Sequence, residues 1–258
     1  MKDIKLRLVY YFYIPNDDFN EMYELHFKCL ERYSNLFDES TFFIAIDDFD
    51  ADKVRYVENR LINCGFNKNV KFNVIPNNES LREAKILKEE IVDKMRDLDG
   101  LTFFAHTKGV STYTINPESN KIWVAAMYYF NLKYVEDVKK YLYEYHNNSY
   151  GFFRCFDSEF YQIKNRWMYC GTFMWLNCPK IHHYIETQNV VVPELFDKYF
   201  AEEFIGNVTP WTLSCSEGGW VTKNQNLYND CKEVLNLFID TEEKLNEFNN
   251  FYNSVCND

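Results

Sequence analysis

Three residues in the middle of the chain, His106, Lys108 and Gly109, have the chemistry to bind an anion together. They follow an apolar run at residues 101–105, which predicts a buried strand that ends just before them. Side chains two residues apart on an extended chain point to the same side, so the imidazole and the ammonium can converge on one ligand. Lysine is a compact cation suited to phosphate, and glycine lets backbone amides approach an anion closely. A surface turn with an incidental lysine is the alternative.

Two further groups of residues follow the first two apolar runs of the chain, where strands would end. Tyr11 and Tyr13 lie near the end of the first run and are placed to flank a nucleobase. Asp47 and Asp48 follow the second run, and Asp47 could contact the base or ribose of a bound nucleotide. Asp48 and Asp50 also form an Asp-x-Asp triplet. A solvated cap at the start of a helix is the favoured interpretation of that triplet, and a metal-binding carboxylate cluster is the alternative.

Gly171, Thr172 and Trp175 are candidates for binding a sugar. Gly171 and Thr172 interrupt an otherwise apolar, strand-like stretch. A glycine inside a strand often marks a bulge or a close approach of the backbone to a ligand. Thr172 could then bond a sugar hydroxyl, and Trp175 offers a flat face on which a sugar ring can stack. A place in the hydrophobic core is the alternative for Trp175.

The elements that must position these residues alternate between strand and helix. Buried strands are predicted at residues 6–14, 41–46, 70–75 and 101–105, with amphipathic helices between them. This order is typical of an α/β fold with a mostly parallel, Rossmann-type central sheet flanked by helices. In such open sheets ligands bind at the carboxyl ends of the strands, where the first two groups of candidates fall. No repeat or linker divides the chain, so we expect a single compact domain.

Local signals predict the start of the third helix, the extent of a long fourth helix and one buried histidine. Ser80 and Glu83 have the spacing of a capping box at the start of the third helix. Residues 120–145 keep helical spacing and predict one long amphipathic helix. His26 lies on the apolar stripe of the first helix, where we expect a packed, hydrogen-bonded histidine rather than a catalytic one.

Composition narrows the classes of protein to consider. The chain has 258 residues and a formal net charge of −11, which argues against nucleic-acid binding because that relies on clustered lysine and arginine. No uncharged apolar stretch is long enough to be a transmembrane segment, and no signal-peptide pattern is present. The eight cysteines include no Cys-x-x-Cys pair, so zinc-site spacing is absent and a cytoplasmic location with reduced thiols fits best.

Four short motifs follow one another along the chain. They are His-Thr-Lys-Gly from His106, Trp-x-x-x-Met-x-x-Phe from Trp123, Cys-Gly-Thr-Phe-Met-Trp from Cys170 and Ala-Glu-Glu-Phe-Ile-Gly from Ala201. This succession resembles a family of bacterial and viral GT-A-type glycosyltransferases that are often encoded with surface-polysaccharide genes. The resemblance implies a GT-A fold. Residues 1–115 would bind a nucleoside-diphosphate sugar, and residues 116–258 would shape the pocket for a glycan acceptor.

The chain departs from the GT-A pattern at one position. GT-A enzymes typically carry an Asp-x-Asp motif after the strand that here ends at Ala105, where it holds a divalent metal on the diphosphate. This chain has His106 and Lys108 there. We therefore expect these two residues to stabilise the negative charge of the diphosphate, with Lys164 and Arg166 as further candidates. A requirement for Mn²⁺ or Mg²⁺ stays open.

Glycosyl transfer also needs a group that removes the proton of the acceptor hydroxyl. Glu202 matches the carboxylate that recurs in the fourth motif, and Glu203 is its neighbour. Side chains of adjacent helical residues point about 100° apart, so only one of the two should face the pocket, and we favour Glu202. Asp157 is an additional candidate for the base.

Together these features predict a glycosyltransferase that moves a hexosyl or deoxyhexosyl group from a nucleoside-diphosphate sugar to a glycan, in surface-polysaccharide or glycan synthesis. Two alternatives stay open. One is a non-catalytic module that binds a nucleotide sugar or a glycan. The other is a metal-dependent phosphoryl-transfer enzyme that uses Asp47, Asp48 and Asp50. The donor, the acceptor, the stereochemistry and the oligomeric state are not determined by the sequence.

Overall fold

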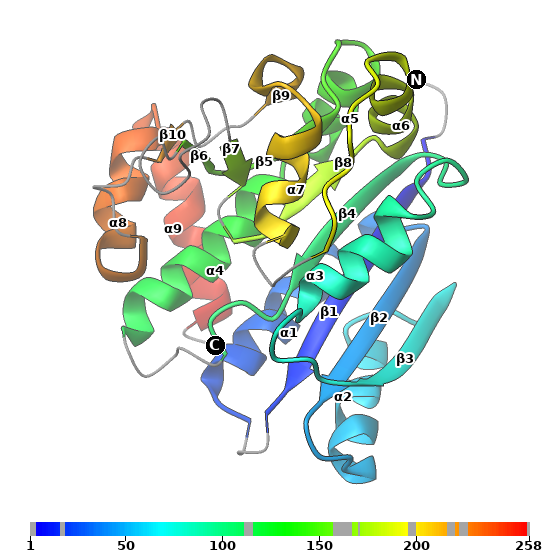
Figure 1. The fold of residues 1–258 in the computed structure, drawn as a ribbon. Coiled ribbons are helices and arrows are strands. Elements are labelled where there is room, and N and C mark those ends of the chain that lie inside the picture. Colours follow the sequence, from blue (N-terminus) through cyan, green and yellow to red (C-terminus); the bar gives the residue numbers. More distant parts are fainter. Residues whose placement is uncertain are drawn as a thin grey trace.

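A seven-stranded sheet forms the centre of the molecule, with strands in the order β3-β2-β1-β4-β8-β5-β9 (Figure 1). The structure, a computed structural model, describes residues 4–15, 19–110, 116–156, 167–169, 171–195, 200–215, 220–221 and 227–256. The strands of this sheet are β1 (Leu6–Ile14), β2 (Glu39–Ile46), β3 (Val70–Pro76), β4 (Leu101–His106), β5 (Ser149–Gly151), β8 (Met174–Leu176) and β9 (Ser214–Cys215). A small second sheet contains β6 (Arg154–Phe156), β7 (Trp167–Tyr169) and β10 (Trp220–Val221) in the order β10-β6-β7.

Most of the neighbouring strands in the large sheet are parallel. β3, β2, β1 and β4 all run in the same direction, β8 is antiparallel to both β4 and β5, and β9 is parallel to β5. The register aligns Tyr11 of β1 with both Phe43 of β2 and His106 of β4. The first four strands therefore end side by side at one edge of the sheet. This is the Rossmann-like α/β arrangement predicted from the sequence, and it is consistent with a GT-A fold.

Helices cover both faces of the sheet. They are α1 (Glu21–Tyr33), α2 (Ala51–Asn63), α3 (Glu83–Ile86), α4 (Pro117–Leu132), α5 (Val135–Tyr143), α6 (Cys178–Thr187), α7 (Phe200–Val208), α8 (Leu227–Phe238) and α9 (Glu242–Cys256). The 3₁₀ turns η1 (Ser34–Leu36) and η3 (Trp211–Leu213) and the π-helical segment η2 (Leu87–Val92), which continues α3, are shorter. Among the helices in the described ranges, none combines the length and the apolar character that crossing a bilayer requires.

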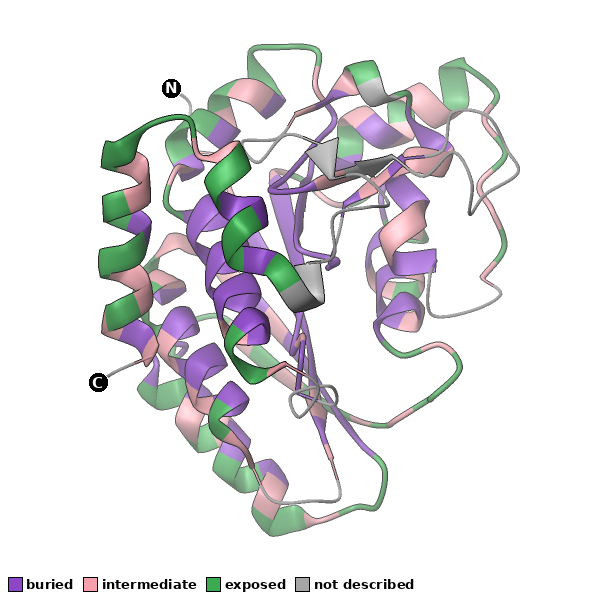
Figure 2. Ribbon diagram, turned by 90° about the vertical axis from the view of Figure 1, so that its left-hand side faces the viewer, coloured by how far each residue is buried: buried purple, intermediate pink, exposed green. Residues whose placement is uncertain are grey.

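The core has two layers because the strands are apolar on both faces. Leu8, Tyr10 and Phe12 of β1 pack in one buried cluster with α1 and α4. Val9 and Tyr11 of the same strand pack in a second cluster with α3 and α7. Buried residues (purple in Figure 2) accordingly concentrate along the sheet and on the helix faces turned toward it. The single compact domain predicted from the sequence is therefore built around the seven-stranded sheet.

The predicted capping box at the start of the third helix is wrong. The side-chain oxygen of Asn78 accepts the backbone amides of Ser80 and Leu81, each at 3.1 Å, so those amides are satisfied by a turn. The helix then begins at Glu83, after Arg82 with φ of 45° and ψ of −133°. The carboxylate of Glu83 is consequently turned into the protein and does not return to the amide of Ser80.

The predicted long helix over residues 120–145 is two helices, α4 and α5. The reason lies in two carbonyl groups at the end of α4, which accept hydrogen bonds from side chains of the sheet. The carbonyl of Phe130 accepts from the hydroxyl of Tyr150 at 3.0 Å, and that of Asn131 accepts from the indole nitrogen of Trp175 at 2.7 Å. Those carbonyls are thereby bound to the sheet, and a new helix starts beyond them.

Candidate functional site

A hydrogen-bonded cluster joins the carboxyl ends of β1, β2 and β3. The hydroxyl of Tyr13 donates to one carboxylate oxygen of Asp47 at 2.6 Å, and the amide of Asn77 donates to the other at 2.7 Å. The hydroxyl of Tyr11 donates to the side-chain oxygen of Asn77 at 2.7 Å. Burial, and then the bond to Asp47, raise the pKa of Tyr13 to about 12, so it stays a donor. Asn77 was not predicted, although a polar residue two positions after the third apolar run was a signal for it.

The neighbouring aspartates have separate roles. Asp50 accepts the backbone amides of Asp52 and Lys53 at 2.9 and 3.1 Å, which makes it the N-cap of α2. The favoured interpretation of the Asp-x-Asp triplet as a helix-entry cap is confirmed at Asp50, while Asp48 lies exposed beside it. In the part of the chain that the structure describes, no group of three or more His, Cys, Asp or Glu side chains could hold a metal ion.

Lys108 lies just beyond β4 and pairs with a residue that is distant in the sequence. Its ammonium nitrogen is 3.6 Å from a carboxylate oxygen of Glu202 on α7, and the two side chains are 15% and 21% exposed. The same nitrogen lies 4.9 Å from the centre of the Trp123 ring, within cation–π range. The structure thus brings together the predicted diphosphate-binding cation and the predicted base. Glu203, the second candidate for the base, is half-buried on the same helix.

A buried histidine holds the backbone of Lys108. One ring nitrogen of His26 contacts the Lys108 carbonyl at 2.9 Å, and the other contacts the hydroxyls of Tyr10 and Tyr128 at 3.0 and 2.9 Å. Burial lowers the pKa of His26 to about 3, so the ring is neutral, with its Nε2 proton donated to the carbonyl. The expectation of a packed, hydrogen-bonded histidine is confirmed. Gly109 follows with φ of 83°, a conformation that favours glycine.

We expect the His26→Gln protein to lose less stability in acid than the unchanged protein. The unfolded chain binds a proton on His26 near pH 6.5, whereas the folded protein binds it only near pH 3. Stability contributed by the neutral ring is therefore present above pH 6.5 and is lost as the pH falls toward 3. The free energy of unfolding, measured with urea at each pH across this range, should fall with decreasing pH more steeply in the unchanged protein than in the variant, by about 1.4 kcal/mol per pH unit. If the unfolding free energies of the two proteins depended on pH in the same way, a neutral, buried His26 would be contradicted.

His106 differs from its predicted role. Its Nε2 lies 3.2 Å from the carbonyl of Gly171, and its Nδ1 faces the carboxylate of Glu83 at 3.6 Å. Burial, and then the positive charge of Lys108, lower the pKa of His106 to about 3, so the ring supplies no positive charge at neutral pH. In this structure Lys108, rather than His106, supplies the positive charge at the end of β4, and binding of a diphosphate by His106 stays a prediction. The ring instead connects β4 to the turn at Gly171.

The predicted sugar-binding residues lie inside the protein. Gly171 and Thr172 have φ of 87° and 60° and form the turn between β7 and β8, so the predicted interruption of the strand is confirmed. Thr172 is fully buried, and its hydroxyl does not reach solvent. Trp175 is also fully buried, with its ring stacked on Phe37 at 5.9 Å between centres. The predicted contacts of Thr172 and Trp175 with a sugar do not fit this structure, because both side chains are buried: Trp175 lies on β8 between β4 and β5, and Thr172 lies in the buried turn before that strand.

Three predicted residues, Asp157, Lys164 and Arg166, lie outside the described residues. The residues directly after β4 do not offer the oxygen ligands, mainly carboxylates, that Mn²⁺ or Mg²⁺ takes. The ammonium of Lys108 lies there, and the imidazole of His106 at the end of β4 contacts protein groups through both nitrogens. No chemical step is therefore assigned to a metal here.

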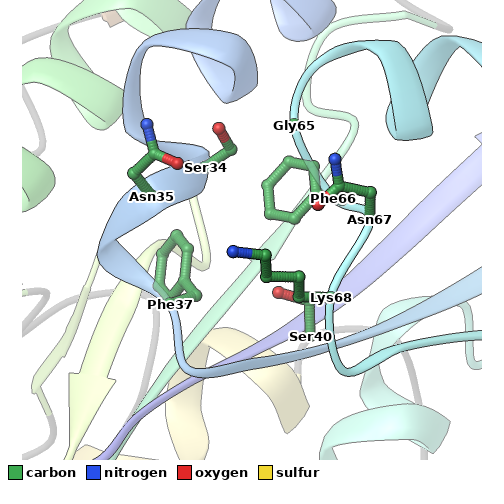
Figure 3. Close-up of a pocket in the computed structure, with 8 residues that line it drawn as sticks. All are labelled: Ser34, Asn35, Phe37, Ser40, Gly65, Phe66, Asn67 and Lys68. Atoms are coloured by element: carbon green, nitrogen blue, oxygen red, sulfur yellow. The ribbon is translucent and has the colours of Figure 1, made fainter.

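A cavity of about 370 Å³ lies at the opposite edge of the sheet. Its lining residues lie just before β2 and β3 or at the start of β2. Figure 3 shows Lys68 extending between the rings of Phe37 and Phe66. The cavity contains none of the predicted site residues. It also lies at the amino ends of the parallel strands, whereas ligands of open α/β sheets bind at the carboxyl ends. The candidate site is therefore the carboxyl edge.

Fold and site together define a Rossmann-like α/β protein with aromatic, acidic and cationic side chains along one sheet edge. The sequence matches no protein-family model and no curated protein sequence. Among solved structures, a crystal structure of TarS from S. aureus is 13% identical with a TM-score of 0.41, and the match covers 97% of this chain and 44% of that one. A crystal structure of S. aureus TarS 1-349 is 12% identical with a TM-score of 0.38, covering 97% and 72%. The chain thus spans less than half the length of the first structure.

Proposed function

We propose that the protein is a glycosyltransferase that uses a nucleoside-diphosphate sugar as donor and a glycan as acceptor. The observation that carries the proposal is the pairing of Lys108 with Glu202 at the carboxyl edge of the parallel strands. A cation for the leaving diphosphate and a carboxylate for the acceptor proton are thereby within reach of one substrate. The pathway suggested by the resemblance, surface-polysaccharide or glycan synthesis, belongs to the same proposal.

The neighbouring cluster supports a nucleotide on the donor. Asp47, Tyr13 and Asn77 present a carboxylate, a phenol and an amide at the same sheet edge as Lys108, where nucleotides bind in this class of sheet. Each of these groups can bond a base or a ribose hydroxyl. Arg82 is exposed near this cluster, and its positive charge acts on both Tyr13 and His106: it opposes the rise in the pKa of Tyr13 and adds to the fall in the pKa of His106. A diphosphate between the cluster and Lys108 would therefore meet positive charge from two sides.

The chain's own residues account for the two demands of the reaction. Lys108 would stabilise the negative charge that develops on the diphosphate as its bond to the anomeric carbon of the sugar breaks and the glycosidic bond to the acceptor oxygen forms. Glu202 would accept the proton of the attacking acceptor hydroxyl. The cation–π contact with Trp123 and the hydrogen bond from His26 to the Lys108 carbonyl hold the cation in place before substrate arrives. Such preorganisation is a large part of electrostatic catalysis.

The structure is compatible with a non-catalytic binding module but disfavours a phosphoryl-transfer enzyme. A module that binds a nucleotide sugar without transfer would share the same edge, so turnover separates it from an enzyme. A phosphoryl-transfer enzyme built on Asp47, Asp48 and Asp50 is disfavoured because Asp50 caps α2 and Asp47 accepts from Tyr13. We therefore do not propose it.

We expect a nucleoside diphosphate and its sugars to raise the melting temperature, and we expect the increase to persist in EDTA. A ligand that binds only the folded state stabilises it by RT ln(1 + [L]/Kd), which is about 2.7 kcal/mol at one hundred times Kd. The test is a thermal-shift panel of the common nucleoside diphosphates and their sugars, each with EDTA and with Mn²⁺. Hits are then incubated with glycan acceptors, and product is detected by mass spectrometry. Absence of any shift in both conditions would remove the proposal.

A further inference from the structure

We propose that the cavity at the amino ends of the parallel strands binds a monosaccharide that carries one anionic group, a phosphate or a carboxylate. The cavity has a volume of about 370 Å³, which lies near the lower end of the range for small-molecule binding sites. It is at the sheet edge opposite Lys108 and Glu202. The inference is therefore a second site, and it does not depend on the proposed function.

Two loops form the walls of this cavity and are hydrogen-bonded to each other. One loop spans residues 34–37 after α1, and the other spans residues 65–68 after α2. The backbone amide of Ser40 donates to the carbonyl of Asn69 at 3.0 Å, and the side-chain amide of Asn69 donates to the carbonyl of Asp38 at 3.1 Å. These bonds join the two loops where β2 and β3 begin. The walls are therefore in place before a ligand arrives.

Two buried serine hydroxyls line the cavity. Ser34 is 7% exposed, and its hydroxyl donates to the carbonyl of Glu31 at 3.2 Å, so its oxygen still has lone pairs that can accept. Ser40 is 3% exposed, and no residue in the described ranges forms a hydrogen bond with its hydroxyl. Figure 3 shows that oxygen turned into the space that the labelled side chains surround. A buried hydroxyl without a partner is costly, and a polar ligand in the cavity would supply the partner.

The lining side chains match the hydroxyl groups of a sugar. Serine hydroxyls and asparagine amides can each donate and accept hydrogen bonds, as sugar hydroxyls do. The lining residues of these two types are Ser34, Asn35, Ser40 and Asn67. The rings of Phe37 and Phe66 add apolar surface for the C–H face of a sugar ring. The eight lining residues, all of them described, include no carboxylate of the kind that binds Mg²⁺ or Ca²⁺, so a divalent metal does not suit the cavity.

Lys68 supplies the positive charge of the cavity. Its side chain extends between the rings of Phe37 and Phe66 (Figure 3). No carboxylate in the described ranges forms an ion pair with its ammonium, although the chain has a net charge of −11. An ammonium in this position attracts an anionic group and offers it hydrogen-bond donors. Because Lys68 is the one charged residue among those that line the cavity, the ligand that fits is a sugar with one anionic group.

The test measures sugar binding to the unchanged protein and to variants by calorimetry. The probes are the 6-phosphates and the uronic acids of glucose, galactose and mannose, the three parent hexoses, and inorganic phosphate. A hydrogen bond to a charged group contributes about tenfold or more to affinity, and one between neutral groups about fivefold. We expect the anionic sugars to bind about tenfold more tightly than the parent hexoses, and Lys68→Gln to abolish that preference. Ser40→Ala should weaken the binding of both classes about fivefold.

Two further variants make the comparison specific. Lys71→Gln removes an exposed cation of β3 that does not line the cavity, and it should leave every affinity unchanged. Asn67→Ala changes an exposed lining residue and should weaken both classes of sugar, so the test still decides if Ser40→Ala fails to fold. Tighter binding of the phosphates than of the uronic acids identifies a phosphate as the anionic group, and the reverse order identifies a carboxylate.

The proposal is overturned if none of the sugars binds at a concentration of about 10 mM. Equal affinities for anionic and neutral sugars, or an equal loss of both in Lys68→Gln, would overturn it because the ammonium would then not bind the anionic group. Inorganic phosphate that binds as tightly as the hexose phosphates would show that the cavity recognises an anion alone. A loss of sugar binding in Lys108→Ala but not in Lys68→Gln would place the sugar at the carboxyl edge. If no nucleoside diphosphate raises the melting temperature, the proposed function fails while these measurements still decide the second site.

Discussion

The Lys108→Ala protein is expected to bind a nucleoside diphosphate at least about thirtyfold more weakly than the unchanged protein. Truncating one partner of a partly buried charge pair costs roughly 2 kcal/mol or more, which is a factor of about thirty in affinity. The variant also removes the cation–π contact with Trp123 and leaves the carboxylate of Glu202 facing the anion. Calorimetric titration with the nucleotide that gives the largest thermal shift measures the effect.

Lys68→Ala is the matched control for this experiment. Lys68 lines the cavity at the opposite edge of the sheet and carries the same charge on the same kind of side chain. We expect Lys68→Ala to bind the nucleotide as the unchanged protein does. If Lys68→Ala loses affinity while Lys108→Ala keeps it, the anion binds in that cavity and the candidate site is misplaced.

For Glu202→Gln we expect a loss of turnover without a loss of nucleotide binding. Loss of a general base typically lowers the rate about 10²- to 10⁴-fold, so transfer to the acceptor should fall by that factor. Binding of the nucleoside diphosphate should become somewhat tighter. In the free protein the Glu202 carboxylate lies 3.6 Å from the ammonium of Lys108 and therefore competes with the diphosphate for that cation. Steady-state kinetics and calorimetry on the same preparation measure the two effects.

Glu203→Gln is the control, since Glu203 is the adjacent residue on α7 and is half-buried as well. It should retain both transfer and affinity. Normal turnover by Glu202→Gln would eliminate Glu202 as the base. A selective loss in Glu203→Gln would transfer the role to its neighbour, and equal losses in both would indicate damage to the helix.

The outline of the fold was predictable because it depends on local patterns. Continuous apolar runs alternating with amphipathic stretches predict buried parallel strands between helices, and the four strands were found within one or two residues of the expected positions. Residues in the last positions of such strands, or directly after them, must lie at the carboxyl edge of the sheet. That is why Tyr13, Asp47 and Lys108 could be placed at one edge from the sequence alone.

The long helix predicted over residues 120–145 is an error that local patterns could not avoid. Its apolar spacing continued through residues 120–145, but carbonyls at the end of α4 accept hydrogen bonds from Tyr150 and Trp175. These partners come from strands distant in the sequence. Spacing reports which residues are apolar and does not report which backbone groups a distant side chain will bind.

The sheet, its helices and the edge at which polar side chains gather all follow from local patterns in the sequence. The pairing of Lys108 with Glu202, the inward turn of Glu83 toward His106 and the burial of Trp175 depend on how the elements pack together. The physical reason is the range of the interactions. Strand and helix formation depends on residues a few positions apart, whereas ionic partners and buried surfaces are set by packing between elements far apart in the chain.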